Sequence, residues 1–342
     1  MNESQSPNGL ISLGGKRWRL CQSDENLVTR FVQVTGLPEF VARLLSQRGV
    51  DPKDLDGFLS PTLRKNCPDP FLMAGMKQLA EDVADRIIQD QKIGILADFD
   101  VDGATSAAIL TRFLRYVGQE PPIYIPDRLD EGYGPNEKAF VSLKEQGAEL
   151  VIIADCGITA HEAIQSGRNL GLDIIVLDHH EPEGDLPKAN HVINPKRDDD
   201  VSGLDMLAAC GVSFLTCVAI NTKIREKGFY KDRVEAPLKS WLDLVALGTI
   251  CDMVPLVGVN RLFVKAGFEQ MAHQNNAGIR ALCQVGNIHQ SPTPEDAGWV
   301  IGPRINAGSR VHRSDLGAKL LSTDSEEAVS YTHLTLPTTV IV

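Results

Sequence analysis

Short apolar runs alternate with longer amphipathic segments through the middle of the chain. The segments 104–117, 136–146, 160–170 and 206–223 carry apolar residues at helical spacing. Strands that are buried on both faces have nearly continuous apolar sequences, and strands that alternate with helices are typical of parallel sheets. The pattern therefore predicts an α/β fold built on a parallel, doubly wound sheet. Its expected strands are 93–97, 122–125, 150–154, 174–177 and, less regularly, 191–193.

Helical patterns without strands flank this α/β region on both sides. Residues 1–15 are polar and predict a disordered N-terminus. Residues 16–90 predict a small helical region that ends in an amphipathic helix over 76–90. We therefore expect the α/β domain at 91–260, followed by a helical segment over 261–330.

Composition and charge narrow the class of protein. The chain is 43% hydrophobic and 23% charged, which is typical of soluble globular proteins. It has no apolar run of the roughly 18 residues that a membrane span needs, and its N-terminus lacks the pattern of a secretory signal. Seven cysteines without a Cys-x-x-Cys pair favour reduced thiols in a cytoplasmic protein and argue against a thiolate zinc site. The net charge of −11 argues against a protein that coats nucleic acid by bulk charge, but it permits a local basic groove.

Three carboxylates follow the first predicted strand. Asp98, Asp100 and Asp102 precede Gly103 at the expected turn from strand to helix. In a parallel sheet such turns lie at the carboxyl edge of the strands, where ligands usually bind. Neighbouring carboxylates repel one another unless a cation neutralises them, and oxygen ligands suit magnesium or manganese. The alternative interpretation is a solvated acidic turn that caps the helix.

Two further strands end in residues of the same kind. Asp155 follows the third strand, and Asp178-His179-His180 follows the fourth. Because the carboxyl ends of parallel strands share one edge, we expect these side chains to converge on a metal site. Asp252 ends an apolar helical segment, where an ionised carboxylate is costly unless it is paired or binds a metal. A helix cap or a pair with an arginine is the alternative for Asp252.

The order of these motifs resembles a known family. The motifs at 98–102, 155, 178–180 and 252 occur in the order found in the DHH phosphoesterase superfamily. More narrowly, the chain resembles the bacterial RecJ single-strand-specific exonucleases over roughly residues 17–330. The other RecJ-like segments are 128–134, 244–249 and 302–307.

The resemblance implies a phosphodiesterase that uses two divalent ions, Mn²⁺ or Mg²⁺, to remove nucleotides from a 5′ end of single-stranded DNA. Two ions about 3.5–4 Å apart can share a hydroxide nucleophile and stabilise both the attacking and the leaving oxygen. By motif position, the resemblance implies that Asp100 and Asp155 hold one ion, which Asp98 supports directly or through water. It implies that Asp102, His179 and Asp252 hold the other ion, and that Asp155 bridges the two.

The resemblance also implies roles outside the ligand set. His180 would face the substrate phosphate, and Asp178 would orient the two histidines. A phosphodiester is anionic and suits guanidinium groups, and an exposed aromatic ring can stack on a base. The substrate-binding candidates are Arg128, Tyr133, Arg304, Asn306 and Arg310.

Each of the main substrate-binding candidates has a structural alternative. Arg128 lies beside Asp127 and Asp130 in the sequence, so it can form an ion pair with either of them. Tyr133 can be an ordinary core aromatic. The sequence leaves both alternatives open.

Two other function classes compete with a single-strand exonuclease acting in recombination and repair. One is a phosphodiesterase of short oligonucleotides or pyrophosphate on the same site, and the other is a non-catalytic DHH scaffold protein. The segment 128–134 and the helical N-terminal region argue against the first, and the complete set of expected ligands argues against the second. The partners implied are single-stranded DNA with a 5′ end, a single-strand-binding protein and a helicase, with no membrane.

The chain departs from the family at its C-terminal end. RecJ-like proteins continue into a second domain with a Gly-Gly-His motif, which this sequence lacks. The last dozen residues, 331–342, carry no Lys, Arg, Asp or Glu, and we interpret them as a non-native tail on a truncated chain. Because the second domain closes the substrate cleft, the resemblance implies a complete metal site with weak, poorly processive nuclease activity.

Overall fold

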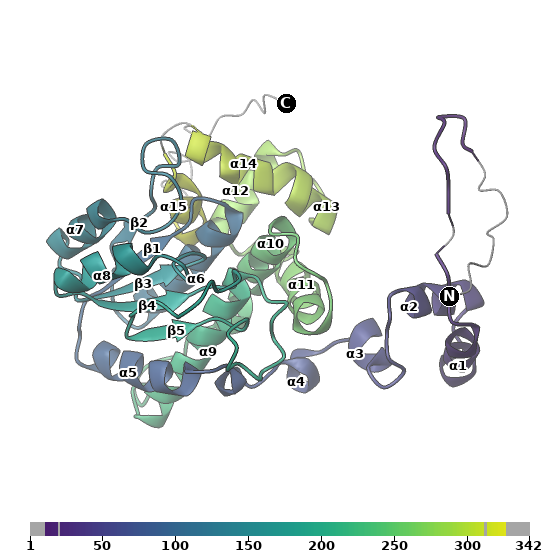
Figure 1. The fold of residues 1–342 in the computed structure, drawn as a ribbon, viewed down its shortest axis with the longest axis horizontal. Helices are drawn as coiled ribbons and strands as arrows, with labels where there is room; N and C mark the ends of the chain where they lie inside the picture. Colours follow the sequence, from purple (N-terminus) through teal and green to yellow (C-terminus); the bar gives the residue numbers. More distant parts are fainter. Residues whose placement is uncertain (1–10, 20, 311–312, 326–342) are drawn as a thin grey trace. The chain divides into compact units, whose positions relative to one another are not determined.

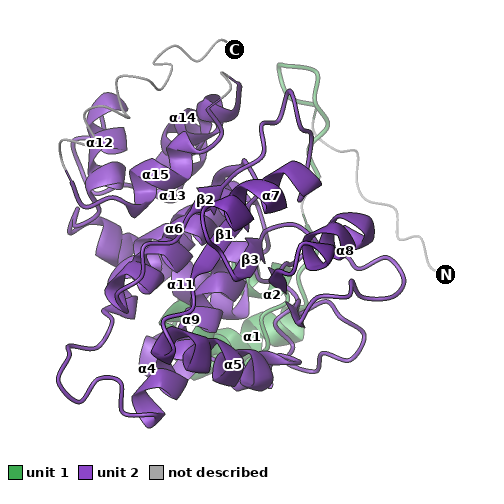
Figure 2. Ribbon diagram, turned by 90° about the vertical axis from the view of Figure 1, so that its left-hand side faces the viewer, with its two compact units in different colours: residues 1–61 green, residues 62–342 purple. Residues whose placement is uncertain are grey.

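The chain forms two compact units, residues 1–61 and 62–342 (Figure 2). The computed structural model describes residues 11–19, 21–310 and 313–325. Residues 1–10 of the N-terminus predicted to be disordered over 1–15, and the predicted non-native tail over 331–342, lie outside these residues.

The first unit is helical. Its helices enclose a small core of their own, made of Val28, Phe31, Ala42, Leu45, Val50 and Leu55. Asp24 caps the first helix by accepting hydrogen bonds from two backbone N–H groups, and Gly36 ends that helix in the left-handed conformation. The helices are α1 (Glu25–Thr35), α2 (Glu39–Gln47) and α3 (Leu55–Leu59).

The helical region predicted over 16–90 spans the boundary between the two units. Its last helix, α5 (Met76–Ile88), packs against α9 (Ala209–Glu226) in the second unit. The apolar face of α5, including Met76, Leu79 and Val83, is fully buried there. The amphipathic pattern thus predicted the helix. The helix that covers its apolar face, α9, begins about 130 residues further along the chain.

Five parallel strands form one sheet in the second unit, in the order β2-β1-β3-β4-β5 (Figure 1). Ala97 pairs with Ala154, and Ala154 pairs with Leu177, so the three central strands end level with one another. The chain changes direction across the sheet between β1 and β3, and ligands bind at such switch points in doubly wound sheets. The strands are β1 (Ile93–Ala97), β2 (Ile123–Tyr124), β3 (Leu150–Ala154), β4 (Asp173–Leu177) and β5 (His191–Ile193).

Both faces of the sheet are covered by helices, as the continuous apolar runs predicted. Ile95 and Ile152 lie in the core with α5, α6 and α9, whereas Leu96 and Ile153 lie in a second core with α7 and α8. Every residue of β1 and β3 is buried. The α/β fold and the doubly wound parallel sheet are therefore confirmed. The further helices of these layers are α6 (Val101–Tyr116), α7 (Glu137–Glu145) and α8 (His161–Asn169).

The C-terminal helices pack around α6. Helices α10, α14 and α15 all contact it. A Cβ atom added at Gly317 of α15 would lie 2.7 Å from Ile305 and 3.4 Å from Ala104, so α14 and α15 approach the first turns of α6 closely. The remaining elements are α4 (Leu63–Asn66), η1 (Pro70–Leu72), η2 (Leu238–Trp241), α10 (Leu242–Cys251), α11 (Gly258–Met271), α12 (Ala277–Val285), α13 (Pro294–Asp296), the π-helix η3 (Ala297–Ile301), α14 (Gly302–Ala307), η4 (Gly308–Arg310) and α15 (Leu316–Ser322).

Within the described parts of the chain, no helix combines the length and the apolar character that crossing a membrane requires.

Asp243 is a buried carboxyl group at the opposite end of α10 from Asp252. It accepts a hydrogen bond of 2.7 Å from the backbone N–H of Leu244 and lines a cavity with Arg112, Arg115 and Asp324. Burial raises the pKa of Asp243 to about 7, even though the Arg112 charge acts in the opposite direction. The folded protein therefore keeps a proton on Asp243 at pH values where the unfolded chain has lost it.

We expect Asp243→Asn to stabilise the protein above pH 7. Between the unfolded pKa, near 4, and the folded pKa, the folded state binds the extra proton, so stability falls as the pH rises and the loss approaches about 4 kcal/mol. Asparagine keeps the shape of the side chain and cannot ionise. Thermal unfolding from pH 4.5 to 8.5 should give similar midpoints at the acidic end and a higher midpoint for the variant at the alkaline end. A constant difference across this range would contradict the assignment.

Candidate metal centre

Asp98, Asp100 and Asp102 all lie between the end of β1 and the first turn of α6. Asp100 is the N-cap of α6, because its side chain accepts a hydrogen bond of 3.0 Å from the backbone N–H of Gly103. Asp102 thus lies in the first turn of the helix, and its side chain is fully buried. A Cβ atom at Gly103 would lie 2.3 Å from the carbonyl oxygen of Asp98, so the turn closes only with glycine at this position.

Asp155 lies on the other side of the switch point, directly after β3. Its backbone N–H donates to the carbonyl oxygen of Leu177, which continues the sheet pairing by one residue. Its φ angle of 63° is left-handed, a conformation that is uncommon for residues other than glycine and that concentrates at functional sites. The carboxyl group is almost completely buried. The fold therefore holds a strained, buried acid at the centre of the sheet edge.

Asp178 organises the two histidines that follow β4. One oxygen of its buried carboxylate accepts hydrogen bonds from the backbone N–H groups of His179 and His180, and it lies 2.7 Å from Nδ1 of the His180 ring. The other oxygen accepts a bond of 2.9 Å from the backbone N–H of Ile158. Asp178 therefore holds the loop and the His180 ring in place from behind.

Asp102 is held from the opposite side by the N-terminus of α9. Its two carboxylate oxygens accept hydrogen bonds of 2.7 and 2.9 Å from the backbone N–H groups of Ala209 and Cys210. The positive end of a helix dipole favours a carboxylate at this place. Asp252 is the C-cap residue of α10, so its side chain reaches the cluster from the C-terminus of that helix. Four separate elements thus supply the acidic and histidine side chains of one cluster.

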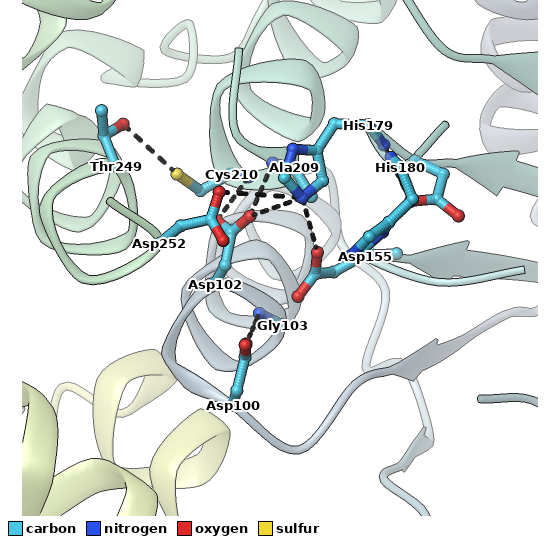
Figure 3. A network of polar contacts seen from close by, with 12 residues as sticks. Asp100, Asp102, Gly103, Asp155, His179, His180, Ala209, Cys210, Thr249 and Asp252 are labelled. Carbon is cyan, nitrogen blue, oxygen red and sulfur yellow. Dashed lines mark hydrogen bonds and ion pairs between the residues drawn. The ribbon is translucent and has the colours of Figure 1, made fainter. Parts of the chain in front are cut away.

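The cluster has His179 at its centre (Figure 3). Its Nε2 atom lies 3.4 Å from Asp155, 3.7 Å from Asp252 and 3.8 Å from Asp102. These distances are too long for strong hydrogen bonds, and within the described parts of the chain neither ring nitrogen of His179 has a hydrogen-bond partner. Ligand atoms within 4.8 Å of one another form three groups, namely Asp98, Asp100 and Asp155; Asp102, His179 and Asp252; and Asp155, His179 and His180.

The electrostatics of the cluster favour the binding of cations. Burial, followed by the neighbouring carboxylates, raises the pKa of Asp98 and of Asp252 to about 7. The same causes raise the pKa of Asp155 well above its usual range. Burial lowers the pKa of His179, which favours the neutral imidazole that binds metals. In contrast, the hydrogen bond with Asp178 raises the pKa of His180.

Asp98 and Asp252 each also have one buried oxygen for which the described residues offer no hydrogen-bond partner. Buried polar atoms are normally satisfied, and unsatisfied ones cost free energy. Carboxylate oxygens with one imidazole form a donor set that suits Mg²⁺ or Mn²⁺. Two of the three groups coincide with the two ligand sets expected from the sequence, so the residues present fit a pair of such ions.

An aromatic side chain covers one rim of the cluster. The Tyr133 hydroxyl donates a hydrogen bond of 3.3 Å to the carbonyl oxygen of Asp155, and its ring meets the rings of Phe99 and His180 edge-on. The Arg128 guanidinium lies 5.2 Å from the centre of the Phe99 ring. Tyr133 is 59% exposed, so it is not a core aromatic. The structure therefore brings Tyr133 and Arg128 to the cluster.

The other three substrate-binding candidates, Arg304, Asn306 and Arg310, come from the C-terminal segment and have different surroundings. Arg304 of α14 donates a hydrogen bond of 2.7 Å to the carbonyl oxygen of Val300 in the preceding η3, and the buried side-chain oxygen of Asn306 has no hydrogen-bond partner among the described residues. Arg310 is exposed. Among the described residues, the hydrogen bonds and ion pairs join none of these three to the carboxylate cluster.

Sequence reasoning missed Asn194. This fully buried residue follows β5 at the same sheet edge, and its side-chain amide donates a hydrogen bond of 2.8 Å to the carbonyl oxygen of His180. The signal was available, because Asn194 is a polar residue that directly follows an apolar strand. The three-residue strand over 191–193 has only a weak sequence pattern. An amide side chain is also a less specific sign of a metal site than a carboxylate or an imidazole.

Comparison with known proteins agrees with this geometry. Residues 92–249 match the family model described as "DHH family, N-terminal domain". The chain is 36% identical over 315 residues to the single-stranded-DNA-specific exonuclease RecJ of Bacillus subtilis, covering 91% of this chain and 38% of the relative. It is 34% identical over 296 residues to the RecJ of Escherichia coli, covering 84% of this chain and 50% of the relative. The chain thus spans half or less of the length of these relatives.

Solved structures of RecJ proteins share the fold. An exonuclease RecJ bound to manganese superimposes with a TM-score of 0.67 at 30% identity, covering 76% of this chain and 64% of the other. The Mn²⁺ complex of RecJ from Thermus thermophilus gives a TM-score of 0.75 at 26% identity, covering 92% of this chain and 43% of the other. The motif order, the sheet-edge cluster and these similarities together establish that residues 92–249 form a DHH-family domain, and that the chain is similar to RecJ exonucleases over most of its length.

Proposed function

We propose that this chain is the catalytic part of a single-stranded-DNA-specific exonuclease that hydrolyses phosphodiester bonds from a 5′ end with two divalent ions, Mn²⁺ or Mg²⁺. The observation that carries the proposal is the pair of ligand groups that meet at one sheet edge. The RecJ relatives, and the manganese bound in their structures, support the substrate class and the ions. The catalytic domain would be 91–260.

The residues of the chain divide into two proposed ligand sets. Asp98, Asp100 and Asp155 would hold one ion, while Asp102, His179 and Asp252 would hold the other, with Asp155 between them. When bound, two such ions supply a metal-activated water and neutralise charge on the phosphodiester. The N-terminus of α9 keeps Asp102 in its orientation, and Asp178 keeps the His180 ring turned toward the cluster rim.

The proposed substrate contacts lie around this rim. His180 would meet the phosphate, and the exposed face of Tyr133 offers a stacking surface for a base. Arg128, Arg304, Asn306 and Arg310 remain candidates for phosphate contacts. We further propose that the enzyme acts in DNA recombination and repair in the cytoplasm, with a single-strand-binding protein and a helicase as partners.

The two alternatives make different demands on the same site. A scaffold protein needs no ligands, yet the acids and histidine of both groups are present and mutually close. A phosphodiesterase of very short substrates needs no extended aromatic and basic rim, yet Tyr133 meets His180 and Arg128 lies over the ring of Phe99, between Asp98 and Asp100 in the sequence. Both observations favour the exonuclease.

A substrate panel tests the proposed function. With Mn²⁺ present, we expect release of mononucleotides from a 5′-phosphorylated single strand, little release from the same strand in a duplex, and none after chelation with EDTA. A 5′-label and a 3′-label on otherwise identical strands report the polarity. Faster hydrolysis of a dinucleotide or of pyrophosphate would favour the short-substrate enzyme. Tight Mn²⁺ binding without hydrolysis of any substrate would favour the scaffold.

A further inference from the structure

The segment that follows β5 is tied to the loop that carries both histidines. Asn194 donates its amide to the carbonyl oxygen of His180, and its side-chain oxygen accepts a hydrogen bond of 2.8 Å from the backbone N–H of Lys196. The carbonyl oxygen of Asn194 also accepts a hydrogen bond of 3.2 Å from the backbone N–H of Arg197. Because Asn194 is fully buried, the backbone of Lys196 has a fixed position relative to the cluster.

The side chain of Lys196 extends to the same rim. Its ammonium nitrogen lies 3.2 Å from the carboxylate of Glu181, the residue after His180. The Lys196 side chain is only 27% exposed, whereas that of Glu181 is 78% exposed. An ion pair with so exposed a partner contributes little, because water competes for both charges. The backbone of Lys196 is thus held in place, whereas the ion pair between its ammonium group and Glu181 is weak.

The charge of Lys196 reaches the cluster itself. Burial is the main cause of the lowered pKa of His179, and the Lys196 charge adds to that lowering. At Asp252 burial raises the pKa, and the Lys196 charge opposes the rise. The geometry places the cation there independently, because Glu181 directly follows His180 and its ion pair with Lys196 brings the ammonium group to the loop that carries both histidines.

We propose that Lys196 is a substrate-positioning residue whose ammonium group binds a phosphate oxygen of the single strand beside the metal centre, with the phosphate taking the place of Glu181. This inference rests on the proposed function. A strand approaching this edge meets at least six acidic side chains, so a fixed cation at the rim offsets part of the repulsion. Glu181 is 78% exposed and held only weakly, and a phosphate oxygen forms a charge-assisted hydrogen bond of the same kind with the ammonium group.

The alternative role for Lys196 is purely structural, namely to neutralise the acidic cluster. The two roles predict different effects of Lys196→Met on metal binding. If Lys196 only stabilises the cluster, its loss disturbs the ligands and weakens Mn²⁺ binding. If it serves the substrate, its loss removes a cation that repels Mn²⁺, so the Kd for Mn²⁺ stays the same or falls.

Lys227→Met is the matched control. Lys227 also forms an ion pair with an acid, at 2.7 Å from Asp85, and its side chain is similarly exposed at 35%. It follows the C-terminus of α9, whose N-terminus holds Asp102. An α-helix of 18 residues is about 27 Å long, so Lys227 is far from the cluster.

The experiment measures fluorescence anisotropy of a 3′-labelled, 5′-phosphorylated phosphorothioate oligothymidylate with Mn²⁺ over a series of salt concentrations. For Lys196→Met we expect about tenfold weaker strand binding, a salt slope smaller by about 0.7, and an unchanged or lower Kd for Mn²⁺ in calorimetry. Glu181→Gln should bind the strand more tightly than the wild type, because it frees the ammonium group.

Three results would overturn the inference. If Lys196→Met binds the strand as well as Lys227→Met does, Lys196 makes no phosphate contact, and the proposed function is unaffected. If Lys196→Met loses strand and Mn²⁺ affinity together, its role is structural. If the wild-type chain itself does not bind the strand in the presence of Mn²⁺, the proposed function fails and takes this inference with it.

Discussion

Asp155→Asn is expected to reduce Mn²⁺-dependent nucleotide release by more than about 100-fold, because changes outside a ligand set already cost 10- to 100-fold in metal affinity or activity. Asp155 belongs to the first proposed ligand set and lies 3.4 Å from Nε2 of His179, a member of the second set, so its loss affects both proposed ions. Asparagine is the appropriate replacement, because it tolerates the left-handed backbone at this position, whereas alanine adds strain. Release of mononucleotides from a 5′-phosphorylated single strand measures the effect.

The same substitution should stabilise the metal-free protein. Burial and the charges of Asp102 and Asp100 disfavour a carboxylate at position 155, and a neutral amide avoids this cost. In EDTA we expect a higher unfolding midpoint for the variant than for the wild type. Added Mn²⁺ should stabilise the wild type, by about 2.7 kcal/mol at a concentration of 100 Kd, and should stabilise the variant far less.

Asp243→Asn is the matched control for Asp155→Asn. It also replaces a buried carboxyl group with raised pKa, but it lies outside the three ligand groups. It should gain stability while keeping both nucleotide release and the response to Mn²⁺. The metal assignment would be wrong if Asp155→Asn retained activity, or if the two variants lost activity to the same degree.

Gly248→Ala is expected to damage the metal site from within the core. Gly248 lies in α10 where that helix crosses α6 and α9, and an added Cβ would lie 2.4 Å from Thr105 Oγ1, 2.6 Å from Cys210 Sγ and 2.9 Å from Asp102 Oδ1. Thr105 and Cys210 are fully buried and hydrogen-bonded, so they cannot move aside cheaply. Overpacking of this kind costs about 1–3 kcal/mol, which exceeds the roughly 1 kcal/mol that alanine gains over glycine in a helix.

Gly267→Ala separates stability from metal binding. An added Cβ at Gly267 in α11 would lie 2.2 Å from the carbonyl oxygen of Leu242 and 2.4 Å from Ala246, so it also forces helices apart, but it touches no ligand. Both variants should unfold at lower temperature than the wild type. Calorimetric titration with Mn²⁺ at a temperature where both are folded should detect weaker binding for Gly248→Ala alone. Equal Mn²⁺ affinities in the two variants would show that Gly248 does not support the ligand geometry.

Much of the fold followed from local patterns. The runs over 93–97 and 150–154 are apolar at every position, and the structure buries every one of these residues between two layers of helices. The amphipathic spacing of α5 identified that helix in the same way. Boundaries were less accurate. The sequence suggested a helix from 104, whereas α6 begins at Val101 because the Asp100 side chain caps it three residues earlier.

The sequence by itself determined that Asp98, Asp155 and Asp178 share one edge, because parallel strands of similar length end level with one another. Only the tertiary structure decided how the remaining partners meet them. Asp102 accepts hydrogen bonds from residues 107 and 108 positions further along the chain. Asp252 lies at the end of α10, and that helix packs closely against Asp102 and its neighbours because Gly248 has no side chain. Asn194 ties the fifth strand to the His180 loop in the same manner. Strand ends are local consequences of strand sequence, whereas these contacts depend on the packing of distant helices and loops, which no short stretch of sequence encodes.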